Sequence, residues 1–382
     1  MRIQVRLPKV KLNEYHEPAS CPHAGCDGQY FKPHGLWGEK KAIRDLKHRE
    51  VISYRWRCLK CKRKFRVYPR GVSRAQQSDL LKALTVLMYT LGLSYGAVSD
   101  VVSAMGCRVS KTTVYNNVQA AGEQARKRQQ YLVKRGGKRA TIGVDATYVK
   151  IKGEQIGVEV VVDDESGDLL GMDIIVSENS EEVIEIIRAV AAEVEAEVMV
   201  SDDHGAYREV ATELGLEQQL CRSHVTRNVD DLAESIGKQL ERQEPLPEGV
   251  DSSPEQLRKD LVKLQKMVRE RPADGADQLK KLYRRYQAAP VPKKGQRHTV
   301  WYRIRMLVTR LWNRWTNLTL DQHRDDLDGT NNSCERLIGW WIKERYRTMR
   351  GYKRTKSVKN VVFLTARMGV RSGQYDMTEL YM

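Results

Sequence analysis

Residues 140–235 constrain the fold most strongly, because short apolar runs alternate there with segments of helical periodicity. Strands are predicted over 141–145, 155–162, 169–176, 198–200 and 217–220. Helices are predicted over 181–194 and 207–214, and a further one opens at residues 221–224. Alternating strands and helices of this kind predict an α/β unit built around one sheet. The first strand ends in Asp145, and the fourth is followed by Asp202 and Asp203.

The order of these elements matches the ribonuclease-H topology, in which three strands form an antiparallel meander and the fourth lies beside the first. Asp145 and Asp202 would then be neighbours despite their distance in sequence, and could chelate one metal ion. We choose Asp202 over Asp203 because Asp202 directly follows the strand. Asp203 is expected to face away from the metals, so its loss should be mild.

Charge is distributed unevenly along the chain. The net charge is +17, with +20 over residues 1–140, −15 over 141–230 and +12 over 231–382. Basic ends predict a polyanionic partner, and the acidic centre predicts either a cation site or an ordinary solvated surface. No run of about 18 apolar residues occurs, and the first residues lack the apolar core of a signal peptide. The expected location is therefore the cytoplasm, with the protein associated with the nucleoid and no membrane partner.

Two cysteine pairs lie near the N-terminus: Cys21 with Cys26, and Cys58 with Cys61. In a reducing compartment, two such knuckles predict one tetrahedral structural Zn²⁺, as in a zinc ribbon. His23 could replace one cysteine, and four unrelated buried thiols are the alternative. The basic run at the second knuckle predicts phosphate contacts by Lys62, Arg63 and Lys64.

Three helices are predicted between residues 75 and 130, the second capped by Ser94 and the third by Ser110. Their spacing fits a helix-turn-helix, although any three-helix packing unit gives a similar pattern. A basic linker around residues 126–139 would follow. The third helix would read DNA through four side chains: Lys111, Thr112, Tyr115 and Asn116.

The C-terminal third predicts an all-helical insertion followed by a final acidic helix. An aromatic stripe over 301–315 is assigned to the core of the insertion in preference to a base-stacking platform. Asn331 or Asn332 can cap a helix that places Glu335 in its first turns, facing Asp145 and Asp202, with Glu344 the next candidate. The basic residues expected to hold DNA across the metals are Lys343, Arg347 and Arg350.

The predicted fold class is a multidomain α/β protein. Its parts are a zinc ribbon (1–72), a helix-turn-helix with basic linker (73–139), a ribonuclease-H-like core (140–236), an all-helical insertion (237–320) and the rest of the core with a basic tail (321–382). Three carboxylates would hold two Mg²⁺ or Mn²⁺ ions, the arrangement that cleaves phosphodiesters.

Asp145, Asp202 and Glu335 in this topology resemble the DDE core of bacterial insertion-sequence transposases. Cys221-x-x-His224 and the helical insertion resemble the Mutator-like branch. The resemblance implies metal-dependent cleavage and strand transfer, double-stranded DNA partners (terminal inverted repeats and target DNA), and a homodimer or higher homo-oligomer. An inactive DNA-binding regulator and a nuclease that only hydrolyses are the alternatives.

For Cys221 and His224 we favour a structural or DNA-positioning role over a second zinc site, which would lack two ligands.

Overall fold

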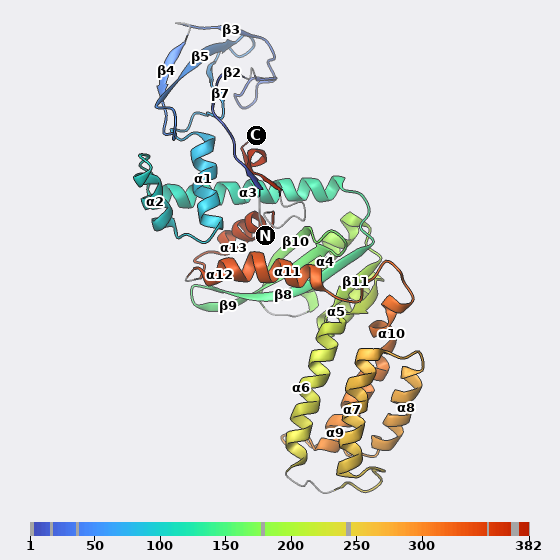
Figure 1. Cartoon of the computed structure of the whole chain (residues 1–382). Coiled ribbons are helices and arrows are strands. Elements are labelled where there is room, and N and C mark those ends of the chain that lie inside the picture. Colours follow the sequence, from blue (N-terminus) through green and yellow to red (C-terminus); the bar gives the residue numbers. More distant parts are fainter. Residues whose placement is uncertain are drawn as a thin grey trace.

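The computed structural model describes residues 4–15, 18–35, 38–176, 180–241, 246–349, 351–367 and 374–381. Figure 1 shows an elongated arrangement, with N-terminal strands at one end, an α/β unit in the middle and a helical bundle at the opposite end. None of the described helices combines the length and apolar character that a bilayer span requires.

The central sheet contains five strands in the order β10-β9-β8-β11-β12. The first three strands form an antiparallel meander, whereas β11 runs parallel to both β8 and β12. This is the strand order that the sequence predicted. Their bounds are β8 Thr141–Ile151, β9 Glu154–Asp163, β10 Leu169–Ile175, β11 Val198–Ser201 and β12 Glu217–Leu220. Strand β8 continues six residues past Asp145, because the alternation persists: Val149 and Ile151 are buried, while Tyr148 and Lys150 are exposed.

Helices cover both faces of this sheet. Side chains at alternate positions of β8 point to opposite faces: Ile142 and Val144 pack with α4 and α5, whereas Val149 and Ile151 join the core beneath the C-terminal helices. The helices on the first face are α4 Ser180–Val194 and α5 Gly205–Leu214. On the second face, α11 Asn332–Leu337, a π-helical turn Ile338–Lys343, α12 Glu344–Arg347 and α13 Thr355–Arg367 follow one another.

Three N-terminal helices pack into the same core as the second face of the sheet. They are α1 Asp79–Thr90, α2 Tyr95–Ala104 and α3 Lys111–Arg135, and Ser94 and Ser110 cap the last two as predicted. Helix α3 is far longer than expected and includes most of the segment predicted as a basic linker. The small residue Gly122 lets α3 approach α13 closely, since a Cβ at Gly122 would lie 2.4 Å from the Asn360 carbonyl oxygen. Packing of this face therefore holds the charged segment in a helix.

The N-terminal strands form a small module around the cysteines. Its strands are β2 Lys11–Tyr15, β3 Phe31–Pro33, β4 Glu39–Ala42, β5 Glu50–Cys58, β6 Lys64–Val67 and β7 Pro69–Arg70. Strand β5 is paired with β3, β4 and β6, all antiparallel. Before the module, β1 Gln4–Arg6 runs parallel to β13 Gln374–Asp376, which precedes the final turn Met377–Leu380. The two ends of the described chain therefore meet.

The insertion is a bundle with its own hydrophobic core, and that core begins with α6 instead of at residue 237. Its helices are α6 Arg222–Leu240, α7 Pro254–Glu270, α8 Gly275–Tyr286, α9 Val300–Asn313 and α10 Trp315–Leu318, followed by a turn Leu320–Gln322. Trp301 is completely buried and Trp315 nearly so. The aromatic stripe is thus core material, as the sequence suggested.

Candidate active site

Asp145 and Asp202 lie at the same edge of two adjacent parallel strands. The register pairs Val200 of β11 with Gly143 of β8; Asp145 lies two residues further along β8, and Asp202 lies two residues after Val200, just past the end of β11. Because side chains alternate along a strand, both carboxylates belong to the face covered by α11. The Ala146 N–H donates to Asp145 Oδ1 over 2.9 Å, and the His204 N–H donates to Asp202 Oδ1 over 2.9 Å.

Asp203 points elsewhere, into the junction with the helical insertion. Its carboxylate is buried and accepts hydrogen bonds from Arg310 Nε of α9 at 2.5 Å and from Arg314 Nε, at the C-cap of α9, at 3.2 Å. Arg208 NH2 lies 3.6 Å from the same carboxylate. The sequence-based expectation that loss of Asp203 is mild therefore needs correction, since this side chain neutralises arginines that tie the insertion to the sheet.

Glu335 reaches the same face of the sheet from α11, whose start is fixed by Asn331. The completely buried Asn331 donates from Nδ2 to the Val144 carbonyl of β8 over 2.7 Å. Its own carbonyl accepts the Glu335 N–H at 3.0 Å, which begins the helix. Gly143 provides the space, because a Cβ there would lie 2.6 Å from Asn331 Oδ1. Sequence reasoning identified Asn331 only as a possible helix cap and missed this connection between Glu335 and the strand of Asp145.

Cys221 and His224 meet Glu335, a contact that the sequence analysis did not predict. Cys221 caps α6 and is completely buried, and the Asn331 N–H donates to its Sγ over 3.3 Å. Glu335 Oε1 lies 3.5 Å from His224 Nδ1 and 3.9 Å from Cys221 Sγ. The hydrogen bond with Cys221 raises the pKa of His224 to about 9. Burial raises the pKa of the Cys221 thiol, but hydrogen bonds from His224 and Asn331 outweigh it and the pKa falls.

The charges of Asp202 and Glu335 both act on Asp145, so the three predicted carboxylates lie in one electrostatic neighbourhood. Burial is the largest cause that raises the pKa of Asp145 to about 6, and the charges of Asp202 and Glu335 raise it further, against an opposing effect of His224. Carboxylate oxygens are the ligands that Mg²⁺ prefers. A divalent cation beside these half-buried carboxylates would offset both their burial and their mutual repulsion. Among the described residues, however, the potential ligand atoms that lie within 4.8 Å of one another are those of the four N-terminal cysteines and of Cys221, His224 and Glu335; Asp145 and Asp202 are in neither group.

The four N-terminal cysteines also converge. All four Sγ atoms lie within 4.8 Å of one another, with Cys21 to Cys61 at 3.7 Å and Cys26 to Cys58 at 3.8 Å. Four sulfurs about 2.3 Å from a tetrahedral zinc would be separated by about 3.8 Å. The cluster therefore fits Zn²⁺. The imidazole of His23 contacts the Lys64 carbonyl oxygen at 3.0 Å, so it already has a partner outside the cluster.

A family model described as "Transposase IS66 family" matches residues 75–348, which include Asp145, Asp202 and Glu335. The chain belongs to the IS66 transposase family. The matched segment starts just before α1 and ends just after α12, so the cysteine module lies outside it. The resemblance to the Mutator-like branch is not supported, because IS66 is a different family.

Solved structures with similarity to this IS66 family member share little sequence with it. The HTLV-2 integrase catalytic core domain, solved with magnesium, is 18% identical, covers 34% of this chain and 86% of its own, and has a TM-score of 0.20. The catalytic domain of Mos1 mariner transposase is 9% identical over 53% of this chain and 93% of its own, with a TM-score of 0.18. No curated protein sequence matches the chain.

The predicted DNA-contacting side chains of this IS66 transposase are mostly at the surface. The exposed ones are Lys62, Arg63, Lys64, Lys111, Thr112, Asn116, Lys343 and Arg347. Tyr115 is half-buried instead: its hydroxyl contacts Ser357 Oγ at 3.3 Å and its ring packs edge-on against Tyr95. Arg350 lies outside the described residues.

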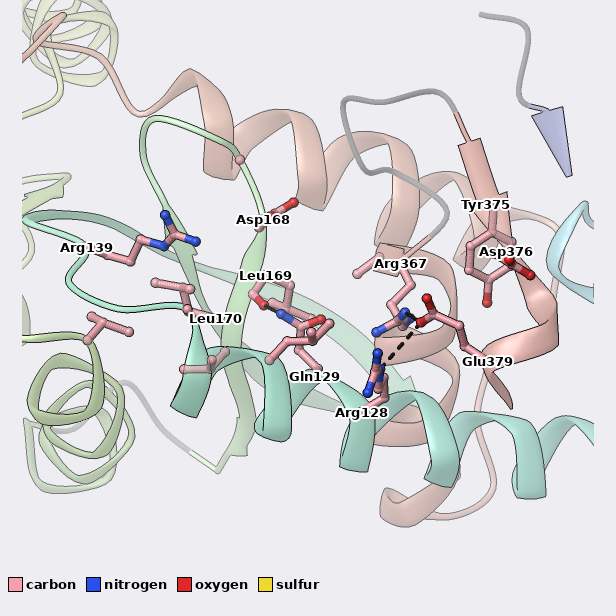
Figure 2. A pocket seen from close by; sticks show the side chains of 16 residues that line it. Arg128, Gln129, Arg139, Asp168, Leu169, Leu170, Arg367, Tyr375, Asp376 and Glu379 are labelled. Atoms are coloured by element: carbon pink, nitrogen blue, oxygen red, sulfur yellow. Dashed lines mark hydrogen bonds and ion pairs between the residues drawn. The ribbon is translucent and has the colours of Figure 1, made fainter. Parts of the chain in front are cut away.

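A pocket of about 500 Å³ lies between α3, β10 and the C-terminal segment, and none of the three carboxylates lines it. Figure 2 shows its lining side chains. Two of its arginines, Arg128 and Arg367, are paired with Glu379. The pocket is therefore a junction where N- and C-terminal elements meet, separate from the candidate active site.

Proposed function

We propose that this IS66-family chain binds the ends of its DNA element, cuts them and joins them to target DNA. The observation that carries the proposal is the register of β8 and β11, which aligns Asp145 with Asp202 on the face where Asn331 seats Glu335. In this proposal Asp145, Asp202 and Glu335 hold two Mg²⁺ or Mn²⁺ ions. Bound there, such ions supply nucleophile activation and charge neutralisation for phosphodiester cleavage.

The proposed chemistry has two steps in one site. Water attacks the phosphorus at the element end, the P–O3′ bond breaks, and the leaving oxygen takes up a proton to become a 3′-hydroxyl. That hydroxyl then attacks a target phosphodiester, forming a new P–O3′ bond and releasing a target 3′-hydroxyl. The role of this chain is to hold the carboxylates on the sheet and the DNA backbone next to them.

Exposed polar and basic residues in three regions of the chain would hold the DNA. Lys62 and Lys64 lie beside the second cysteine pair, Lys111 and Asn116 lie in the first turns of α3, and Lys343 lies eight residues after Glu335. In this proposal one structural Zn²⁺ on the four cysteines shapes the first surface as a zinc ribbon. Helices α1–α3 act as the helix-turn-helix, and the active assembly on DNA is a homodimer or higher oligomer.

The decisive assay uses the full chain, Mg²⁺ and a duplex that ends in the inverted repeat found beside the gene. Glu335→Gln, Asp145→Asn and Asp202→Asn should abolish both cleavage and joining to a plasmid, while end binding persists. Glu344→Gln is the matched control, because Glu344 lies nine residues further along in α12, is exposed and pairs with Arg347. Cleavage by Glu335→Gln, or loss of cleavage in Glu344→Gln, contradicts the assigned triad. Cleavage without joining would assign the chain to the hydrolytic nucleases.

DNA reading is tested separately by gel shift over a range of salt concentrations. Affinity should fall steeply with salt, with a slope of about −0.9 per neutralised phosphate. Lys111→Ala and Asn116→Ala should reduce the preference for the element end over a scrambled duplex more than they reduce total affinity. Because α3 shares its core with the sheet, the measurement needs the whole chain and not an N-terminal fragment. If both variants keep the wild-type preference for the element end, α3 is not the helix that recognises the DNA sequence.

A further inference from the structure

Cys221, His224 and Glu335 bring a sulfur, a nitrogen and an oxygen to one point. The three ligand atoms lie within 4.8 Å of one another. The residues come from two separate elements, the start of α6 and the start of α11. Their convergence is fixed by tertiary structure, because Asn331 contacts both β8 and Cys221.

The distances in this cluster are poor for hydrogen bonds. N–H···O bonds are normally 2.7–3.2 Å long, yet His224 Nδ1 and Glu335 Oε1 are 3.5 Å apart. Cys221 Sγ and the same oxygen are 3.9 Å apart. Within the described chain, the buried His224 Nδ1 has no partner at normal hydrogen-bond geometry, although the neighbouring Cys221 thiol influences its pKa. The three polar atoms thus face one another at distances that are long for hydrogen bonds between them.

The same distances suit the ligands of one metal ion. With Zn–S near 2.3 Å and Zn–N and Zn–O near 2.1 Å, a tetrahedral ion separates nitrogen from oxygen by about 3.4 Å and sulfur from oxygen by about 3.6 Å. The observed 3.5 and 3.9 Å are close to these values. The Asn331 N–H that donates to Cys221 Sγ is the type of outer contact that orients a metal-bound thiolate.

We propose that Cys221, His224 and Glu335 form a second site for a thiophilic divalent cation of the Zn²⁺ class. A thiolate and an imidazole select such ions over Mg²⁺, which prefers oxygen ligands. His224 and Glu335 keep 21% and 32% of their side-chain surface exposed, so an ion can enter and a fourth position stays open. The site differs from the cysteine cluster, which has four protein ligands.

Occupation of this site has a consequence for catalysis, which rests on the proposed function. Glu335 would belong to both ligand sets, and a carboxylate oxygen bound beside Cys221 and His224 is withdrawn from the Mg²⁺ site. A Zn²⁺-class ion should therefore inhibit Mg²⁺-dependent cleavage by competing for Glu335. Removal of the thiol or the imidazole should relieve that inhibition.

The first experiment counts zinc after equilibrium dialysis of the metal-depleted full-length protein. The wild type should bind two zinc ions per chain, and Cys221→Ser and His224→Gln one each. Cys107→Ser is the matched control, because Cys107 is also buried but its Sγ donates to the Asp45 carbonyl, away from both metal sites; this variant should still bind two zinc ions. Circular dichroism confirms that each variant is folded. His224→Gln preserves the Cys221–Asn331 contact should Cys221→Ser fail to fold.

A second measurement uses Co²⁺ as a spectroscopic probe. The thiolate–cobalt charge-transfer absorption of His224→Gln should be weaker than that of the wild type. The difference should equal the contribution of one thiolate, about a quarter of what the four thiolates of the cysteine site contribute. One zinc per chain in the wild type, or unchanged stoichiometry and spectrum in both variants, overturns the site.

Cleavage assays with added Zn²⁺ complete the test. Zinc should lower the Mg²⁺-dependent rate of wild type and of Cys107→Ser, each relative to its own zinc-free rate, and should spare His224→Gln. Equal inhibition of all three proteins overturns the competition for Glu335. Absence of any cleavage without zinc would count against the proposed function, while the zinc stoichiometry would still decide the second site.

Discussion

Asp202 and Asp203 are adjacent in sequence, yet their loss should have opposite effects. Asp203→Ala removes the buried partner of Arg314, whose side chain is only 14% exposed, and of Arg310 and Arg208, which are about half exposed. Removing one partner of a buried pair costs about 3–5 kcal/mol, whereas exposed pairs contribute about 0–1 kcal/mol. Since two of the three arginines can regain water, we expect a loss of about 2–4 kcal/mol in the free energy of unfolding.

Asp202→Ala should leave stability unchanged or slightly increase it without metal, because the Asp202 charge disfavours ionised Asp145. It should also abolish Mg²⁺-dependent cleavage. Urea unfolding followed by tryptophan fluorescence suits the comparison, since Trp301, Trp312 and Trp315 all report on the insertion. With a slope of about 3 kcal/mol per M, the midpoint of Asp203→Ala should fall by about 1 M. A stable but inactive Asp203→Ala beside an active Asp202→Ala would refute the strand register.

Three further outcomes are expected. Cys58→Ser should release the zinc of the cysteine module and unfold that module alone, which metal analysis together with near-ultraviolet circular dichroism would detect; a wild type without zinc would contradict the site. Because the fold raises the pKa of Asp145 from 3.8 to about 6, it favours the protonated form, so metal-free protein should lose stability as pH rises from about 4 to about 6. Asp145→Asn should remove that loss in urea midpoints measured in chelator; an identical pH profile would exclude Asp145 as its source. Gly143→Ala should destabilise the wild type more than the Asn331→Ala variant, because its Cβ would meet Asn331 Oδ1 at 2.6 Å; additive losses in a double-mutant cycle would disprove the contact.

The sheet could be predicted from the sequence because its signals are local. Apolar alternation marked β8 to β12, and the strand order then placed Asp145 beside Asp202. Ser94 and Ser110 cap helices where expected, since a capping hydroxyl needs only the N–H groups that follow it.

Contacts between residues that are far apart in sequence could not be predicted from local patterns. Helix α3 continues through a basic segment because Gly122 packs against Asn360, more than two hundred residues away. The meeting of Glu335 with Cys221 and His224 depends on Asn331 contacting two elements at once. The role of Asp203 required knowledge of the position of α9. In each case the decisive contact joins residues far apart in sequence, so it is set by the tertiary fold.

The pairing of β1 with β13 means that the chain enters and leaves the cysteine module under restraint. On one side the module is anchored by β1 on the C-terminal strand, and on the other it leads directly into α1, which packs in the core of the sheet. A module on a single linker can swivel, whereas this one is restrained at both of its ends and lies at one end of the elongated molecule (Figure 1). In the proposed function, this restraint would fix the distance between the bases that the cysteine module contacts and the phosphodiester that reaches the carboxylates. The position of the cut would then depend on spacing along the duplex as well as on base sequence.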